Sequence, residues 1–182
     1  LRSFQLQNNQ FTGDLPDIFG GLDSLVLFLA QNNQFEGSIP SSIGNCEQLQ
    51  TLDFSQNLLT GSIPTSIGQT NLVTFKAPNN SLSGTLPSEI GQLNELASLH
   101  LNNNQLDSLI PGTFDQLPNL KTLLLNDNQL KGVIPQQLNN SPDLISIALQ
   151  FNQLTGTIPV TWGQLDSLAS LRLNNNQLSG TI

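Results

Sequence analysis

Apolar residues recur at the same places in a repeating phrase along the whole chain, and this pattern predicts the fold. The phrase begins with a leucine in each of eight copies, 24 residues apart except for one 23-residue copy between Leu49 and Leu72. The opening residues are Leu1, Leu25, Leu49, Leu72, Leu96, Leu120, Leu144 and Leu168. Self-similarity at a fixed period of this size predicts a solenoid, in which each coil packs mainly on its neighbours.

Positions 1, 4, 6 and 11 of every copy are apolar, with the small residues Ala30 and Ala77 at position 6. The alternation L-x-x-L-x-L predicts a short strand in each coil, and stacked coils then form a parallel sheet. Positions 2, 3, 5, 7 and 8 are expected to face outward from that sheet. The segments that complete each coil are too short for full helices and favour 3₁₀ turns on the opposite side.

Position 9 is asparagine in all eight copies, between residues that are expected to be buried. The turn after each strand leaves backbone N–H and C=O groups without partners, and an amide side chain carries both a donor and an acceptor that can satisfy them. The sequence therefore predicts an asparagine ladder made by Asn9, Asn33, Asn57, Asn80, Asn104, Asn128, Asn152 and Asn176.

A glycine and a proline follow most of the asparagines at fixed spacing. Position 13 is glycine in seven copies and Ser108 in the fifth, and an apolar residue and proline come after it in successive copies. Glycine permits backbone angles that other residues avoid, while proline fixes φ and withholds a donor. Together they are expected to bend the chain from the strand side toward the back of the coil.

Composition and charge narrow the range of partners. The chain of 182 residues is 37% hydrophobic but only 10% charged, with a net charge of −8. This charge argues against nucleic acid as a partner, because phosphate binding needs clustered Lys and Arg. No apolar run approaches the roughly 18 residues of a membrane helix, so no membrane contact is expected.

The repeats predict a single solenoid domain over residues 1–182, with about 7.6 repeats of the phrase. The first and last copies lack the caps that shield the terminal coils of a solenoid. We therefore expect the chain to be an uncapped fragment of a longer protein.

The phrase N-x-L-x-G-x-I-P, as in residues 57–64, resembles the plant-type class of leucine-rich repeats over the whole chain. The resemblance implies an α/β solenoid, rich in β-structure, wound as a right-handed superhelix. Its parallel sheet would line the concave face, with 3₁₀ turns on the convex face and a second short strand in each repeat. The fifth copy departs from the pattern at Asp107 and Ser108, so the second strand is least expected there. Similar proteins include receptor-like ectodomains and inhibitors of wall-degrading enzymes, which implies an extracellular or cell-surface location.

Position 5, at the centre of the expected strand face, varies more between copies than any other outward position. It reads Gln5, Leu29, Asp53, Lys76, His100, Leu124, Ala148 and Arg172. A surface that varies on a constant frame suits recognition, and Phe151 at position 8 adds an exposed aromatic that could anchor a partner. The predicted binding patch comprises Asp53, Lys76, His100, Leu124, Phe151 and Arg172. Asp53 and Lys76, in adjacent coils, are expected to form a surface ion pair of little energetic value.

Enzymatic activity, a metal site and a cofactor are not expected. With one histidine and one cysteine, the chain cannot assemble most catalytic or metal-binding constellations. Cys46 replaces a core leucine and is expected to be a buried free thiol. Asn79 and Asn139 begin N-x-[ST] sequons, which are candidate N-glycosylation sites if the chain is secreted.

Three functions are compatible with the sequence. The first is a recognition scaffold that binds a peptide, protein or glycan through the concave sheet face. The second is a structural component of a fibre or larger assembly. The third is ice binding, suggested by hydroxyl columns at position 3 and position 14. Leu27, Leu109 and Val133 interrupt those columns, and small hydroxyl residues are common on strand surfaces, which favours the first function.

Overall fold

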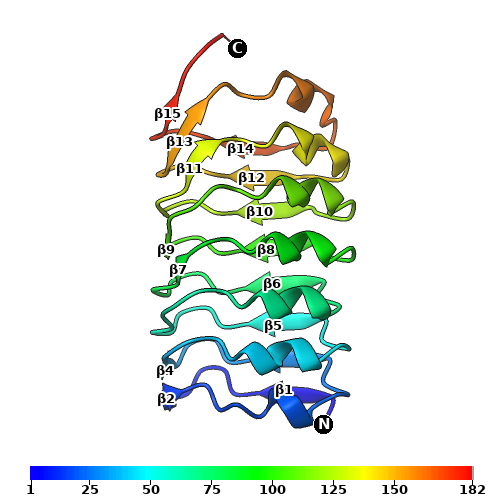
Figure 1. Cartoon of the computed structure of the whole chain (residues 1–182), viewed down its shortest axis with the longest axis vertical. Helices are drawn as coiled ribbons and strands as arrows, with labels where there is room; N and C mark the ends of the chain where they lie inside the picture. Colours follow the sequence, from blue (N-terminus) through cyan, green and yellow to red (C-terminus); the bar gives the residue numbers. More distant parts are fainter. Residues whose placement is uncertain (182) are drawn as a thin grey trace.

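The computed structural model describes residues 1–181, without the side chain of Gln137; Ile182, the last residue of the expected domain, lies outside the described residues. The coils stack along one axis from the N-terminal to the C-terminal end (Figure 1). Each coil contributes one strand to a continuous sheet, and its other segments return along the opposite side. The predicted solenoid is confirmed.

The main sheet has eight parallel strands in the order β1-β3-β5-β6-β8-β10-β12-β14. Each strand covers positions 3 to 5 of its repeat, where the apolar residue at position 4 is flanked by outward residues. The strands are Ser3–Gln5, Leu27–Leu29, Thr51–Asp53, Thr74–Lys76, Ser98–His100, Thr122–Leu124, Ser146–Ala148 and Ser170–Arg172. Equivalent positions pair throughout, so that Lys76 lies between Asp53 and His100 on adjacent strands.

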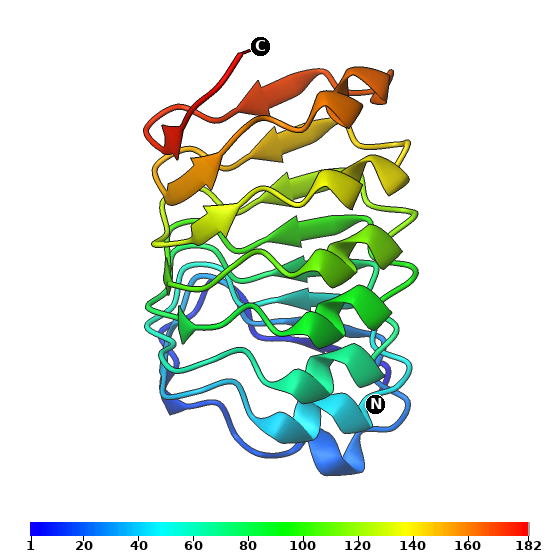
Figure 2. The ribbon, with the colours of Figure 1, turned by 45° about the horizontal axis from the view of Figure 1, so that its top comes forward.

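Short 3₁₀ helices lie on the side opposite the sheet, as Figure 2 shows. They occupy η1 Phe19–Gly21, η2 Ser41–Asn45, η3 Thr65–Gln69, η4 Ser88–Gln92, η5 Gly112–Gln116, η6 Gln136–Asn140 and η7 Val160–Gln164. Each of the six helices from η2 onward follows a proline with ψ between 123° and 141°, for example Pro87 with φ −66° and ψ 135°. Proline therefore marks the point where the chain enters the back of the coil.

A second series of short strands follows the asparagine turn. These strands are β2 Thr12–Asp14, β4 Gln34–Glu36, β7 Ser83–Gly84, β9 Gln105–Leu106, β11 Lys131–Val133, β13 Gln153–Gly156 and β15 Gln177–Leu178. The expectation that the second strand would be least certain in the fifth copy was wrong, because that copy contains β9. The third copy, which is fully within the described part, has no second strand. Hydrogen bonds from Thr60 N to Gly37 O (2.7 Å) and Leu58 N to Phe35 O (2.8 Å) still join the third copy to the second.

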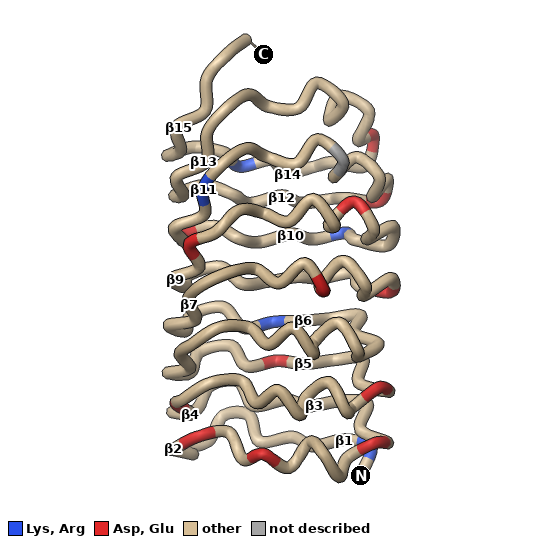
Figure 3. Tube along the Cα trace, viewed as in Figure 1, with Lys and Arg blue, Asp and Glu red and all other residues tan. Residues whose placement is uncertain are grey.

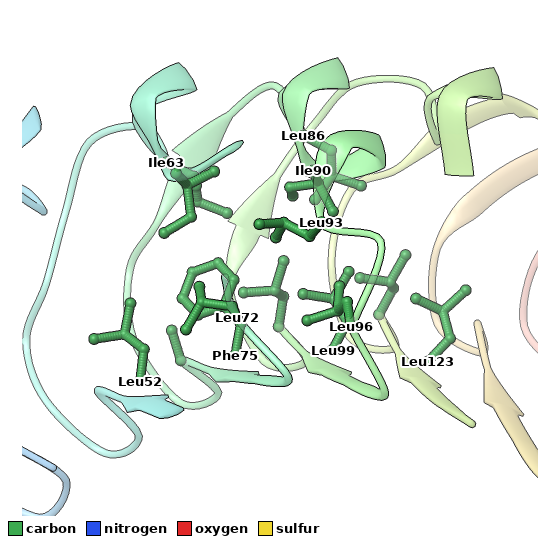
Figure 4. Packing of buried hydrophobic residues seen from close by; sticks show 14 of the residues in the cluster. Leu52, Ile63, Leu72, Phe75, Leu86, Ile90, Leu93, Leu96, Leu99 and Leu123 are labelled. Atoms are coloured by element: carbon green, nitrogen blue, oxygen red, sulfur yellow. The ribbon is translucent and has the colours of Figure 1, made fainter. Parts of the chain in front are cut away.

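The core is a continuous column between the sheet and the 3₁₀ helices. Figure 4 shows Leu52, Phe75, Leu99 and Leu123 from the strands, with Ile90 on the helix side above them. The four strand residues are 0% exposed. Burial of the position-4 side chains in successive coils makes the core depend on stacking, as expected for a solenoid.

The asparagines at position 9 join successive coils. The Asn57 amide nitrogen donates to the carbonyl oxygens of Ala30 and Phe54, both at 3.0 Å. Its side-chain oxygen accepts from the Phe35 backbone nitrogen, also at 3.0 Å. Every amide from the second to the eighth copy makes the same set of bonds, within its own coil and to the preceding one. Asn9 in the first copy bonds only within its own coil.

The copy from Leu49 has 23 residues instead of 24, and the missing residue falls on the back of the coil, after η3. The residue after η3 is Thr70, which is buried and whose hydroxyl donates to the Ile67 carbonyl at 2.8 Å. The next opening leucine follows one residue earlier than in other copies, yet Asp53 still pairs with Lys76 in the sheet. The deletion therefore leaves the sheet face in register.

Candidate recognition face

The outward side of the eight-stranded sheet, here called the sheet face, presents one residue from each coil at position 5. The registered residues are Gln5, Leu29, Asp53, Lys76, His100, Leu124, Ala148 and Arg172. Gln5 and Arg172 are exposed, Ala148 is buried, and the other five are half-buried. The sheet thus brings five residues of the predicted patch, from Asp53 to Arg172, into one column across neighbouring strands.

The expected ion pair between Asp53 and Lys76 is absent from the described residues. Asp53 instead accepts hydrogen bonds from the backbone nitrogen of Ser55, at 2.9 Å, and from the Ser55 hydroxyl. Ser55 is only two residues from Asp53, so it holds the carboxylate more readily than the flexible side chain of Lys76 in the next coil. The Lys76 ammonium is therefore available to a partner on the sheet face.

His100 lies on the sheet face in a partly dehydrated position. Its Nε2 atom is buried and has no hydrogen-bond partner among the described residues. Burial lowers the pKa of His100, the Lys76 charge lowers it further, and Asp53 opposes them by raising it. The neutral imidazole is favoured, and it can present either a donor or an acceptor to a partner.

Phe151 lies at position 8, in the turn that follows β12. Its side chain is 51% exposed, and its backbone has φ of 56°. All eight residues at position 8 adopt this left-handed conformation: Asn8, Asn32, Gln56, Asn79, Asn103, Asp127, Phe151 and Asn175. The sequence pattern did not reveal this conformation, because four different residue types occupy the position. The abundance of asparagine there was the available signal, since asparagine tolerates these angles.

The two sequons differ in their surroundings. Asn79 is exposed at position 8, and its side-chain oxygen accepts from Asn103 Nδ2 at 2.9 Å. Asn139 is half-buried in η6, and the hydroxyl of Ser141 in its sequon is buried and donates to the Leu117 carbonyl at 2.6 Å. Asn79 is therefore the more accessible of the two candidates.

The rest of the surface carries acidic side chains and a groove beside the second strands. Figure 3 shows acidic segments at turns along the edges of the solenoid. A groove of about 530 Å³ lies beside the second strands, lined by Leu109, Val133, Pro135 and Pro159 among others. Within residues 1–181, no cluster of three or more potential metal ligands occurs, and every helix is too short or too polar to cross a membrane.

Cys46 is 0% exposed and is a free thiol, and its sulfur lies 3.5 Å from the Phe19 carbonyl oxygen. Burial raises the pKa of the Cys46 thiol, and the negative charge of Asp23 adds to this. The thiolate, which is the reactive form, is therefore disfavoured. Cys46 belongs to the core and not to a reactive site.

The fold and the sheet face define a class: a parallel solenoid with an asparagine ladder and a variable outward column. Family models described as leucine rich repeat match residues 70–130 and 118–178, and further repeats match residues 1–22, 24–46 and 48–70. The chain belongs to the leucine-rich-repeat family. No curated protein sequence matches it at a significant level.

Solved structures of plant receptors share the fold closely. The plant peptide hormone receptor RGFR1, in complex with RGF2, matches 100% of this chain with a TM-score of 0.97 and 38% identity. The leucine-rich-repeat ectodomain of the Arabidopsis receptor kinase HAESA, in complex with an IDA peptide hormone, also matches 100% with a TM-score of 0.96 and 35% identity. The chain spans only 29% and 31% of these two structures.

A plant ice-binding protein matches 100% of the chain and 66% of its own length, with a TM-score of 0.75 and 24% identity. At this level of identity the likeness shows the shared fold and nothing about function.

Proposed function

We propose that this chain is a non-enzymatic recognition module of an extracellular or cell-surface protein. It binds a peptide, protein or glycan partner through the sheet face. The observation that carries the proposal is the position-5 column, in which eight parallel strands in register present acidic, basic, apolar and amide side chains on a constant frame. A few well-placed side chains on a rigid surface supply most of the binding energy in protein interfaces.

A peptide is the partner that the comparisons favour. RGFR1 and HAESA, which share the fold at TM-scores of 0.97 and 0.96, are peptide hormone receptors. The face also offers a cation at Lys76 that is not engaged by Asp53, a neutral imidazole at His100 and an exposed guanidinium at Arg172. These groups suit carbonyl and carboxylate oxygens along an extended chain.

The experiment uses the 182-residue chain and a phage-displayed library of linear dodecapeptides. Peptides selected on the chain are tested against a variant with Asp53, Lys76, His100, Leu124, Phe151 and Arg172 all replaced by alanine. The proposal predicts loss of binding with no fall in melting temperature. Peptide recognition by this face would be contradicted if the alanine variant still bound the peptides, or if no peptide were selected. Either result would favour a structural role.

Ice binding remains the second alternative, and the structure gives it less support. Ice-facing surfaces need regular uncharged columns, but the position-3 hydroxyls lie beside Asp53, Lys76 and Arg172 at position 5. At position 14, the exposed side chains of Leu109 and Val133 interrupt the other column, at 61% and 62% exposure. Thermal hysteresis in a solution of the purified chain would support ice binding, and no detectable hysteresis would contradict it.

A further inference from the structure

The turn at position 8 imposes a left-handed backbone on every coil, whatever the residue. Backbone hydrogen bonds run through the turn, with Asn128 N donating to Phe151 O at 3.2 Å and Phe151 N donating to Asn174 O at 3.0 Å. Because the bonds on both sides fix the chain, Phe151 cannot relax to negative φ without breaking the stack. Its φ of 56° is unfavourable for a bulky aromatic residue.

Asparagine at the same position fits the turn and adds bonds between coils. Asn32 Nδ2 donates to Asn8 Oδ1 at 2.7 Å, and Asn103 Nδ2 donates to Asn79 Oδ1 at 2.9 Å. A phenylalanine forgoes these bonds as well as the tolerance of asparagine for the left-handed region. The stability of the solenoid therefore does not explain why phenylalanine occupies position 151.

Packing does not compensate for the strain. Phe151 is outside the cluster of core residues and the partly buried residues that pack against it, and half of its side chain meets solvent. A strained, exposed aromatic side chain points to a functional requirement, because such outliers persist at binding and catalytic sites.

The neighbours of Phe151 suggest what it contacts. Gln150, the preceding residue, has a buried side-chain oxygen without a donor among the described residues, as do Gln7 and Gln31 at the same repeat position. Ala148, at position 5 of the same coil, is small and lies between Leu124 and Arg172 in the sheet. An extended peptide can place an apolar side chain against the exposed aromatic ring of Phe151.

We propose that Phe151 is the anchoring residue of the sheet face, and that it binds an apolar side chain of a linear peptide partner. This inference rests on the proposed recognition function and adds the residue that sets its specificity. The Phe151 ring, 51% exposed, offers that side chain an apolar contact near the C-terminal strands of the face.

Phe151→Asn is the direct test, because it removes the ring and restores the residue that suits the turn. The melting temperature is expected to rise by about 2–4 °C, because asparagine tolerates the left-handed angles that strain phenylalanine. Binding of peptides selected on the unmodified chain is expected to weaken at least tenfold. A separate selection on the variant should lack the apolar residue shared by the first set of peptides.

Phe11→Asn is the matched control, since Phe11 is 44% exposed and its ring stacks on Phe35 at 5.9 Å, away from position 8. It should lower the melting temperature and leave peptide binding unchanged. The anchor is contradicted if Phe151→Asn binds the peptides as well as the unmodified chain while the six-residue alanine variant does not. A lower melting temperature for Phe151→Asn would show that phenylalanine is not strained at this position. If the six-residue variant also keeps its binding, the recognition function fails first, and the anchor fails with it.

Discussion

The side-chain nitrogen of Asn57 donates a hydrogen bond to the carbonyl oxygen of Ala30, which lies in the preceding coil, at 3.0 Å. Asn57 is 6% exposed, so the groups that it satisfies have no ready access to water. Repeated along the chain, this bond joins the coils at the point where each strand turns inward. The ladder adds side-chain bonds between coils to the backbone pairing of the sheet.

Replacing Asn57 with alanine should destabilise the solenoid by about 1–3 kcal/mol, because the buried Phe35 N–H loses its acceptor. The carbonyl oxygens of Ala30 and Phe54 each lose one of two donors and keep those from Asn33 and Asn80. Urea unfolding measures the change. Asn9→Ala is the control, since Asn9 is exposed and bonds only within its own coil, to Leu6 and Gln7. Its cost should stay below about 1 kcal/mol, and equal costs for the two variants would show that the inter-coil bonds contribute little.

Glycines in the 3₁₀ helices leave room for the backbone of the next coil. A β-carbon on Gly91 in η4 would lie 2.4 Å from the backbone oxygen of Thr113 in η5. Gly91→Ala should force the two coils apart and cost about 1–3 kcal/mol, measured by urea unfolding. Gly163, at the same repeat position in η7, has open space around its β-carbon site. Gly163→Ala should be neutral or stabilising by up to about 1 kcal/mol, and a similar loss in both variants would refute the close-approach argument.

His100 should make stability depend on pH in the mildly acidic range. Its pKa in the folded chain lies below the ordinary 6.5, so the unfolded chain takes up the proton first as the pH falls. The unmodified chain should therefore lose stability relative to His100→Gln as the pH falls from about 6.5 through the folded pKa. Lys76 lies beside His100 on the adjacent strand β6, and Asp53 lies one strand further away on β5, while Leu124 on the other side is uncharged. A constant difference between the two proteins from pH 8 to about pH 5 would contradict the lowered pKa.

The sequence predicted the parts of the fold that follow from periodic burial. The strands around Phe75 and Leu99, the asparagines at position 9 and the 3₁₀ segments all depend on the alternation of apolar and polar residues within one coil. Those rules are local, so a single sequence is enough to apply them.

What the sequence did not predict depends on contacts between coils or on competition between partners. The close approach at Gly91 is invisible without the next helix, and the left-handed turn at Phe151 is imposed by hydrogen bonds from both neighbouring coils. Ser55 displaces Lys76 as the partner of Asp53 because it is nearer along the chain. For the candidate site, the column of outward residues could be predicted, but the hydrogen-bond partners and burial of its side chains could not.

Chemical-shift mapping by solution NMR, with a library-selected peptide added to the labelled chain, tests the role of the sheet face most directly. Recognition by this face predicts shifts concentrated in β5, β6, β8, β10, β12 and β14 and in the turn at Phe151. Shifts concentrated instead on η1 to η7, or in the groove at Leu109 and Val133, would contradict it.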